Sequence, residues 1–207
     1  MQYLISILIG YLLGSIPTAF LVMKKKGIDI TVEGSGNVGA MNTYEVSKSK
    51  LIGFIVFVVD FLKGLLSVLL IKWLYSPEFI FPALALLFAV FSHCFNPWIN
   101  FKGGRGLATA AGGSIILVPY LLFGWILIWV ISFIYKKDIL LSNILATPLS
   151  LMLVLGKPDL AAKYALNQPD VNLLILFSTS GLIIIFIKHI EPLKEIIQTY
   201  KSRGMKK

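Results

Sequence analysis

The sequence predicts an all-α integral membrane protein with seven transmembrane helices. The chain of 207 residues is 57% hydrophobic with a mean hydropathy of +0.84, and 14% of its residues are charged, against about 25% in a soluble domain. Its apolar residues form long runs, most of them near the roughly 20 residues that one transmembrane helix needs. Its basic residues, which give a net charge of +9, lie mostly between the runs. We therefore expect residues 1–207 to form a single membrane domain rather than a soluble, disulfide-rich or disordered chain.

Six apolar runs are the expected membrane segments. The first has no basic leader region and no small-residue cleavage site, so we expect a retained helix rather than a signal peptide. The fourth carries no charge and is too long for one untilted helix, so we expect it to break near Pro119 into two helices, one of them short. The runs cover residues 2–23, 51–75, 79–99, 107–135, 139–155 and 171–187.

Loop charges favour seven helices over six, because Lys and Arg collect on the cytoplasmic side. With seven helices and the N-terminus outside, 15 basic residues fall inside and 3 outside, whereas six helices leave nine on each side. The prediction is therefore an outside N-terminus and a cytoplasmic C-terminus. We interpret the basic charge as this topology signal and a contact with anionic lipid. Nucleic-acid binding is not expected, because no basic stripe is interleaved with aromatic residues.

The residue inventory excludes several kinds of chemistry. Cys94 is the only cysteine, so it cannot form an internal disulfide. One cysteine and two histidines do not make a zinc site of the usual nitrogen and sulfur ligands, and we expect neither a metal nor a cofactor. No spaced Ser-His-Asp set and no acidic pair stands out. We therefore expect fixed donors and cations to act on a substrate that brings its own leaving group, such as phosphate.

A glycine-rich segment at residues 34–42, Gly-Ser-Gly-Asn-Val-Gly-Ala-Met-Asn, is the first candidate anion site. It matches G-x-G-x-x-G, but a dinucleotide fold needs a preceding strand, and here a membrane helix and a lysine-rich turn precede it. Successive N–H groups can converge on an anion; a flexible loop is the alternative interpretation. The candidate donors are Gly34, Ser35, Gly36, Asn37, Gly39 and Asn42.

A second candidate phosphate site lies immediately before a helix expected to begin near Leu107. Glycines there leave free N–H groups at the positive end of the helix dipole. Arginine can also hold a phosphate through two parallel hydrogen bonds. A basic loop that only follows the topology rule is the alternative. The candidates are Lys102, Gly103, Gly104, Arg105 and Gly106.

Four other polar residues fall at or near the expected cytoplasmic side. His93 and His189 lie at helix ends and could donate to a phosphate or act as a general base, or only end their helices. Lys63 shares a helix face with Asp60 three residues earlier, so it either pairs with Asp60 or faces an anionic substrate. Ser142 is either a helix N-cap or a further donor.

In order and spacing these motifs resemble the bacterial acyl-phosphate-dependent glycerol-3-phosphate acyltransferase family, over about residues 10–195. The resemblance implies a seven-helix fold with a cytoplasmic active site in the bacterial plasma membrane. It implies transfer of a fatty acyl group from acyl phosphate to the 1-hydroxyl of glycerol 3-phosphate, the first step of phospholipid synthesis. Membrane lipid and the soluble enzyme that makes acyl phosphate are the further partners expected. The matching blocks are Gly14-Ser15-Ile16-Pro17, residues 34–42, Asp60-x-x-Lys63-Gly64 and His93 with residues 101–109.

The resemblance also assigns roles by position. Ser35 matches the family's essential serine and His189 a histidine important for activity, so these two are the expected catalytic residues. The segment at residues 102–106 matches the phosphate-binding loop, and Glu191 a structural glutamate.

Three positions depart from the family pattern, which usually has arginine, serine and asparagine where this chain has Glu45, Asn143 and Pro192. The change at Glu45 reverses a charge that could hold a phosphate. Two alternatives therefore stand beside the leading interpretation. One is a degenerate paralogue that binds or carries an organic phosphate or anionic lipid. The other is an acyltransferase with a different acceptor or donor.

Overall fold

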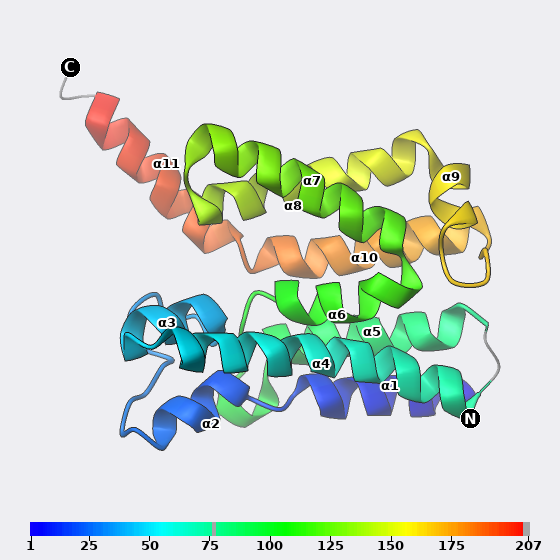
Figure 1. Cartoon of the computed structure of the whole chain (residues 1–207), viewed down its shortest axis with the longest axis horizontal. Helices are drawn as coiled ribbons and strands as arrows, with labels where there is room; N and C mark the ends of the chain where they lie inside the picture. Colours follow the sequence, from blue (N-terminus) through cyan, green and yellow to red (C-terminus); the bar gives the residue numbers. More distant parts are fainter. Residues whose placement is uncertain (76–77, 205–207) are drawn as a thin grey trace.

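The computed structural model describes residues 1–75 and 78–204, and the regular structure in these ranges is helical (Figure 1). The helices are α1 (Gln2–Gly14), α2 (Thr18–Lys24), α3 (Ala40–Ser47), α4 (Lys50–Leu74), α5 (Ile80–Cys94), the short 3-10 helix η1 (Pro97–Ile99), α6 (Leu107–Leu117), α7 (Pro119–Lys136), α8 (Ile139–Gly156), α9 (Pro158–Lys163), α10 (Val171–Ile187) and α11 (Ile190–Gly204).

The helices are long and apolar enough for a multi-pass membrane protein. Within the described ranges, five segments could cross a membrane, or six if α10 and the start of α11, bent by 50°, form one span. Helix α6 is apolar but has only 11 residues. The predicted break near Pro119 is confirmed, because α6 ends at Leu117 and α7 begins at Pro119. Proline suits this position, since the first residue of a helix needs no N–H donor.

The first apolar run, expected as one retained helix, forms two helices. It is divided into α1 and α2 at Ser15, Ile16 and Pro17. Proline has no N–H and disfavours a helical conformation in the residue before it, which accounts for the division. The carbonyl groups released from the helix at Ser15 and Ile16 become acceptors for distant side chains.

Small residues let the central helices pack with their backbones in contact. A Cβ atom at Gly10 of α1 would overlap the carbonyl oxygen of Ala85 in α5, and one at Gly64 of α4 would overlap the carbonyl oxygen of Thr109 in α6. Such close approach is typical of helix association in membranes, where small residues replace bulky ones at the interface.

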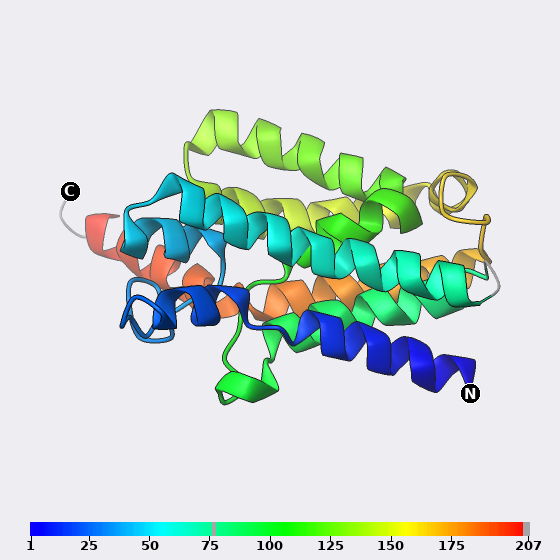
Figure 2. The same cartoon turned by 60° about the horizontal axis from the view of Figure 1, so that its bottom comes forward.

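The bundle has two groups of helices with α6 between them. Helices α1, α4 and α5 lie on one side of α6, and α7, α8 and α10 lie on the other (Figure 1). Figure 2 shows α2, α3 and α11 at one end of the bundle, and the N-terminus and α9 at the opposite end. The end that carries α2, α3 and α11 also carries the glycine-rich loops.

Candidate functional site

The first glycine-rich loop is shaped by Asn42, which lies in the first turn of α3 and is 1% exposed. Its Oδ1 accepts the N–H of Ser35 at 2.9 Å, and its Nδ2 donates to the carbonyl oxygens of Glu33 and Asn37 at 3.0 Å each. We expected Asn42 to be a donor to an anion, but its amide is directed at the loop backbone. Gly34, with φ +60°, is packed so closely that a Cβ atom would overlap Oδ1 of Asn42.

The outer part of this loop remains accessible. Gly34 and Ser35 are exposed, Gly36 and Asn37 are half-buried, and Gly39 is buried. Gly36 has φ +66°, a left-handed conformation that favours glycine. The loop therefore presents Gly34 and the side chain of Ser35 to the surroundings, while Asn42 holds the Ser35 N–H from beneath.

The second glycine-rich loop packs directly against the first. The N–H of Val38 donates to the carbonyl oxygen of Gly103 at 3.3 Å, and the N–H of Gly104 donates to the carbonyl oxygen of His93 at 3.1 Å. Gly103 and Gly104 are buried, and a Cβ atom at Gly104 would overlap Nε2 of His93. Lys102 is exposed beside them. The structure thus joins two segments that the sequence separates by about 60 residues.

Beneath the two loops lies a buried polar network around Lys63. Its ammonium group is 2.5 Å from Oδ1 of Asp60 and 2.5 Å from the carbonyl oxygen of Ile16. Nδ1 of His93 lies 3.8 Å from the same carboxylate oxygen. Lys63 and Asp60 are 3% and 2% exposed. The adjoining cavity is about 10 Å³, which is room for about one water molecule, so Lys63 is paired with Asp60 here rather than open to a phosphate.

Two residues of this network were not among the predicted site residues. Nδ2 of Asn96 donates to the carbonyl oxygen of Ser15 at 2.7 Å, which ties η1 to the break between α1 and α2. The hydroxyl of Thr18 lines the small cavity and has no hydrogen-bond partner among the described residues. The only feature of the sequence that pointed to these two residues was the Gly14-Ser15-Ile16-Pro17 block. Thr18 follows this block in sequence, and Asn96 contacts it in space.

At the start of α6 the loop brings a guanidinium group toward the end of α10. Gly106, the residue before α6, has φ +81° and packs on α5, where a Cβ atom would lie 2.8 Å from Sγ of Cys94. Arg105 is half-buried. Burial lowers the pKa of Arg105, and the carboxylates of Glu195 and Glu45 oppose that shift. Arg105 therefore lies within electrostatic reach of Glu45, one of the three positions that depart from the family pattern.

His189 is fully buried just past the end of α10. Its Nδ1 lies 2.8 Å from the carbonyl oxygen of Ile185, so Nδ1 carries the proton and donates, and Nε2 is the free acceptor. Within the described part of the chain, Nε2 has no hydrogen-bond partner. Burial lowers the pKa of His189. The hydrogen bond to the carbonyl oxygen of Ile185 raises the pKa, and the charge of Arg105 lowers it further. The imidazole is therefore neutral at pH 7.

Lys188 adds a second cation beside His189. Its ammonium group is 5.0 Å from the centre of the Phe95 ring. Burial lowers the pKa of Lys188, the carboxylate of Glu191 opposes that shift, and the charge of Arg105 adds to it. Glu191 itself is exposed. Arg105 and Lys188 thus form a partly desolvated positive region at the N-terminal end of α6.

Ser142 lies elsewhere, and of its two alternative roles the N-cap is wrong. The N-cap of α8 is Asp138, whose Oδ1 accepts the N–H of Leu141 at 2.9 Å. Ser142 lies one turn inside the helix, is fully buried, and donates its hydroxyl to the carbonyl oxygen of Asp138 at 2.6 Å. Three helical residues precede Ser142, so Asp138 is the cap, because an N-cap must precede the first turn.

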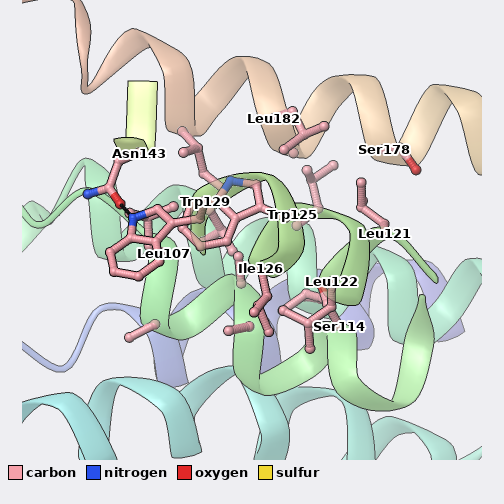
Figure 3. A pocket seen from close by; sticks show the side chains of 18 of the residues that line it. Leu107, Ser114, Leu121, Leu122, Trp125, Ile126, Trp129, Asn143, Ser178 and Leu182 are labelled. Carbon is pink, nitrogen blue, oxygen red and sulfur yellow. Dashed lines mark hydrogen bonds between the residues drawn. The ribbon is translucent and has the colours of Figure 1, made fainter. Parts of the chain in front are cut away.

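A large apolar cavity of about 400 Å³ lies between α5, α6, α7 and α10, with Asn143 of α8 at one end (Figure 3). One end is lined by Leu107 and Ile185, which adjoin Gly106 and His189. The polar groups there include Nε1 of Trp129, which donates to Oδ1 of Asn143 at 2.7 Å. The cavity therefore begins where the positive region ends, an arrangement suited to a ligand with an anionic head and a hydrocarbon tail.

Known proteins resemble this chain over nearly its whole length. The family profile described as Glycerol-3-phosphate acyltransferase matches residues 4–199. The protein named glycerol-3-phosphate acyltransferase in Ehrlichia canis is 34% identical to this chain, over 95% of this chain and 96% of that protein. The protein of the same name in Streptococcus mutans is 36% identical, over 95% of this chain and 91% of that protein.

Solved structures show the same architecture. Two crystal structures of PlsY (YgiH), an integral membrane glycerol 3-phosphate acyltransferase, are each 27% identical to this chain and cover 96% of it. The glycerol 3-phosphate form has a TM-score of 0.80 and is covered over 94% of its length. The lysophosphatidic acid form has a TM-score of 0.78 and is covered over 93%.

Proposed function

Because this chain belongs to the glycerol-3-phosphate acyltransferase family and is an enzyme that forms lysophosphatidic acid, we propose that its acyl donor is an acyl phosphate and its acceptor the 1-hydroxyl of glycerol 3-phosphate. The observation that carries this proposal is the junction between the positive region at α6 and the apolar cavity. An acyl phosphate has the two parts that such a junction accommodates.

The donor's phosphate lies, in this proposal, against Arg105, Lys188 and the N–H groups of the first turn of α6. An α-helix N-terminus with a glycine before it binds phosphate through its free N–H groups and its dipole. The acyl chain enters the cavity past Leu107 and Ile185. Arg105 and Lys188 then neutralise the charge that grows on the departing phosphate.

The acceptor's phosphate lies at the exposed faces of the two joined loops, near Ser35 and Lys102. The N–H of Gly34 and the hydroxyl of Ser35 offer donors there, and Lys102 adds a cation, whereas the N–H groups of Ser35 and Gly36 donate to Oδ1 of Asn42 and to the carbonyl oxygen of Glu33. Asn42, Lys63 and His93 act as positioning residues, because each is buried and contacts the loops or the carboxylate beneath them.

The reaction joins the 1-hydroxyl oxygen to the acyl carbon and breaks the bond between that carbon and the phosphate oxygen. Nε2 of His189 is buried without a partner among the described residues. In this proposal substrate binding displaces the side chains that cover Nε2, which then accepts a hydrogen bond from the acceptor hydroxyl and orients it toward the acyl carbon. The hydroxyl proton ends on the released phosphate, either directly or through His189 or Ser35. Inorganic phosphate and lysophosphatidic acid are the products.

The loop charges support a bacterial plasma membrane protein with its site in the cytoplasm. Counting α6 as a short span gives seven spans, with the N-terminus outside and the end that carries α2, α3 and α11 inside. Glycerol 3-phosphate then arrives from the cytoplasm, and the soluble enzyme that makes acyl phosphate meets the same face.

The deciding experiment measures phosphate release by the purified protein in detergent with palmitoyl phosphate, with and without glycerol 3-phosphate. We expect release that depends on the acceptor, with lysophosphatidic acid formed in equal amount. Release that does not depend on glycerol 3-phosphate would contradict its proposed role as the acceptor. Formation of lysophosphatidic acid from another acyl donor, but not from palmitoyl phosphate, would contradict the donor.

A further inference from the structure

The end of the apolar cavity farthest from Arg105 lies beside the turn between α6 and α7. There α6 ends at Leu117 and the chain turns through Val118 into α7, and both residues are almost completely buried. The N–H of Leu166 donates to the carbonyl oxygen of Leu117 at 2.9 Å, which fixes the turn. Leu121 and Leu122, in the first turn of α7, line this end with Ser114 and Ser178 (Figure 3). We call these four residues the cavity floor.

We propose that the cavity floor sets the length of acyl chain that the enzyme prefers. This proposal rests on the placement of the acyl chain in the cavity. From Leu107 to Ser114 along α6, and from Ile185 to Ser178 along α10, the chain advances seven residues, or about 10 Å at 1.5 Å per residue.

The energetics of burial make such a limit measurable. Each methylene transferred from water to an apolar site contributes about a fourfold gain in binding. That gain stops when the chain reaches a floor that cannot move, because packed interiors resist even one extra methylene. The Phe79 and Phe177 rings, in edge contact at 5.6 Å, are part of the packed core at this end.

One side of the cavity offers the competing route. Phe57 of α4 and Ile126 of α7 line the cavity and are 44% and 41% exposed, so they face the surrounding lipid as well. A chain that left between α4 and α7 would never meet the floor. Chain-length dependence separates these two paths.

The test uses three variants and a series of acyl phosphates from about 10 to 18 carbons. Leu122→Ala deepens the floor, Ser178→Leu fills it, and Phe123→Ala changes an exposed residue adjacent to Leu122. For each length, kcat/KM of the variant is divided by that of the unmodified enzyme, so partition of the substrate into micelles cancels.

We expect the ratio for Leu122→Ala to rise at least fourfold from the shortest to the longest chain, and the ratio for Ser178→Leu to fall by as much. Phe123→Ala should give a ratio that does not depend on length. Length-independent ratios for both floor variants would overturn the proposal and favour exit between α4 and α7.

A second measurement does not depend on the identity of the donor. Lysophosphatidic acids of the same chain lengths are added to each protein, and the rise in Tm is recorded, because a ligand stabilises the state that binds it. The length at which the rise in Tm levels off should increase in Leu122→Ala and decrease in Ser178→Leu. An unchanged length in folded variants would count against the floor even if acyl phosphate proved not to be the donor.

Discussion

The side-chain amide of Asn42 accepts the backbone N–H of Ser35 at 2.9 Å across the mouth of the first glycine-rich loop. A buried residue thus controls the backbone at the position where an exposed serine is presented. The asparagine has no free donor of its own within the described residues, since Nδ2 is directed at the carbonyl oxygens of Glu33 and Asn37. Its contribution to activity should therefore be made through the loop.

Asn42→Ala should raise the KM for glycerol 3-phosphate and lower kcat/KM by roughly 10- to 100-fold, because an unsatisfied buried group costs about 1–3 kcal/mol. Asn172→Ala, at an exposed residue at the start of α10, is the matched control and should leave both constants unchanged. Steady-state kinetics with glycerol 3-phosphate as the varied substrate measures the effect. Equal constants in the two variants would show that the loop does not need Asn42.

Lys63→Met should lower stability strongly, because it leaves the Asp60 carboxylate buried without its partner. Breaking a buried ion pair from one side costs about 3–5 kcal/mol, or roughly 10 °C in Tm for a chain of this length. The double variant Asp60→Asn, Lys63→Met should recover part of that loss. A double variant as unstable as the single one would show that Lys63 acts on something other than Asp60.

Lys102→Gln should raise the KM for glycerol 3-phosphate several-fold with little change in Tm, since Lys102 is exposed. The effect should shrink as salt is added, because exposed charges are screened. Lys163→Gln, at an exposed residue of α9 at the opposite end of the bundle, removes the same charge and should have no effect on KM. A KM that does not change in Lys102→Gln would remove this residue from the acceptor site.

Arg105→Gln should raise the KM for acyl phosphate rather than that for glycerol 3-phosphate. A hydrogen bond to a charged group contributes about 1.5–3 kcal/mol, so an increase of roughly 10- to 100-fold is expected. The two KM values, measured in turn at saturating partner substrate, separate this role from that of Lys102. A larger effect on the KM for glycerol 3-phosphate would show that the phosphate of the acceptor, and not that of the donor, lies at Arg105.

Acid should inactivate and destabilise the enzyme partly through His189. Its folded-state pKa lies below the usual value of 6.5 because of burial and the nearby Arg105 charge. Below pH 6.5 the unfolded state therefore binds a proton that the folded state resists, and the free energy of unfolding falls as pH falls toward the lowered pKa. His189→Gln should flatten that part of the curve of Tm against pH and lower kcat. If Tm falls with decreasing pH equally in His189→Gln and in the unmodified enzyme, another group causes the loss of stability in acid.

Patterns along the chain predicted the parts of the fold that depend on local composition. Charge counting and length predicted the break at Pro119, and the apolar run at 171–187 matches α10 to the residue. The two glycine-rich loops, predicted separately as anion sites, are joined by the hydrogen bond from Val38 to Gly103.

Other features depend on contacts that no local pattern contains. Motif spacing placed Asn42 among the donors, but its actual partners follow from the start of α3 at Ala40, which turns the side chain beneath the loop. The sequence left open whether Lys63 pairs with Asp60 or faces an anionic substrate, because the i, i+3 spacing on one helix face is compatible with either role. The apolar cavity takes its lining from positions between Phe57 and Ile185, and apart from Asn143 no pattern in the sequence marks them out from other membrane-helix residues.

The break at Pro17 has a consequence for biogenesis. The carbonyl oxygen of Ser15 accepts a hydrogen bond from Asn96, 81 residues later. That of Ile16 accepts one from Lys63, 47 residues later, in addition to the local N–H of Thr18. A nascent chain that has inserted only its first apolar segment therefore lacks the groups that stabilise the bent form. In hydrocarbon such carbonyls are costly to leave unpaired, so the first segment should enter the bilayer in another shape and rearrange after α4 and η1 have been synthesised.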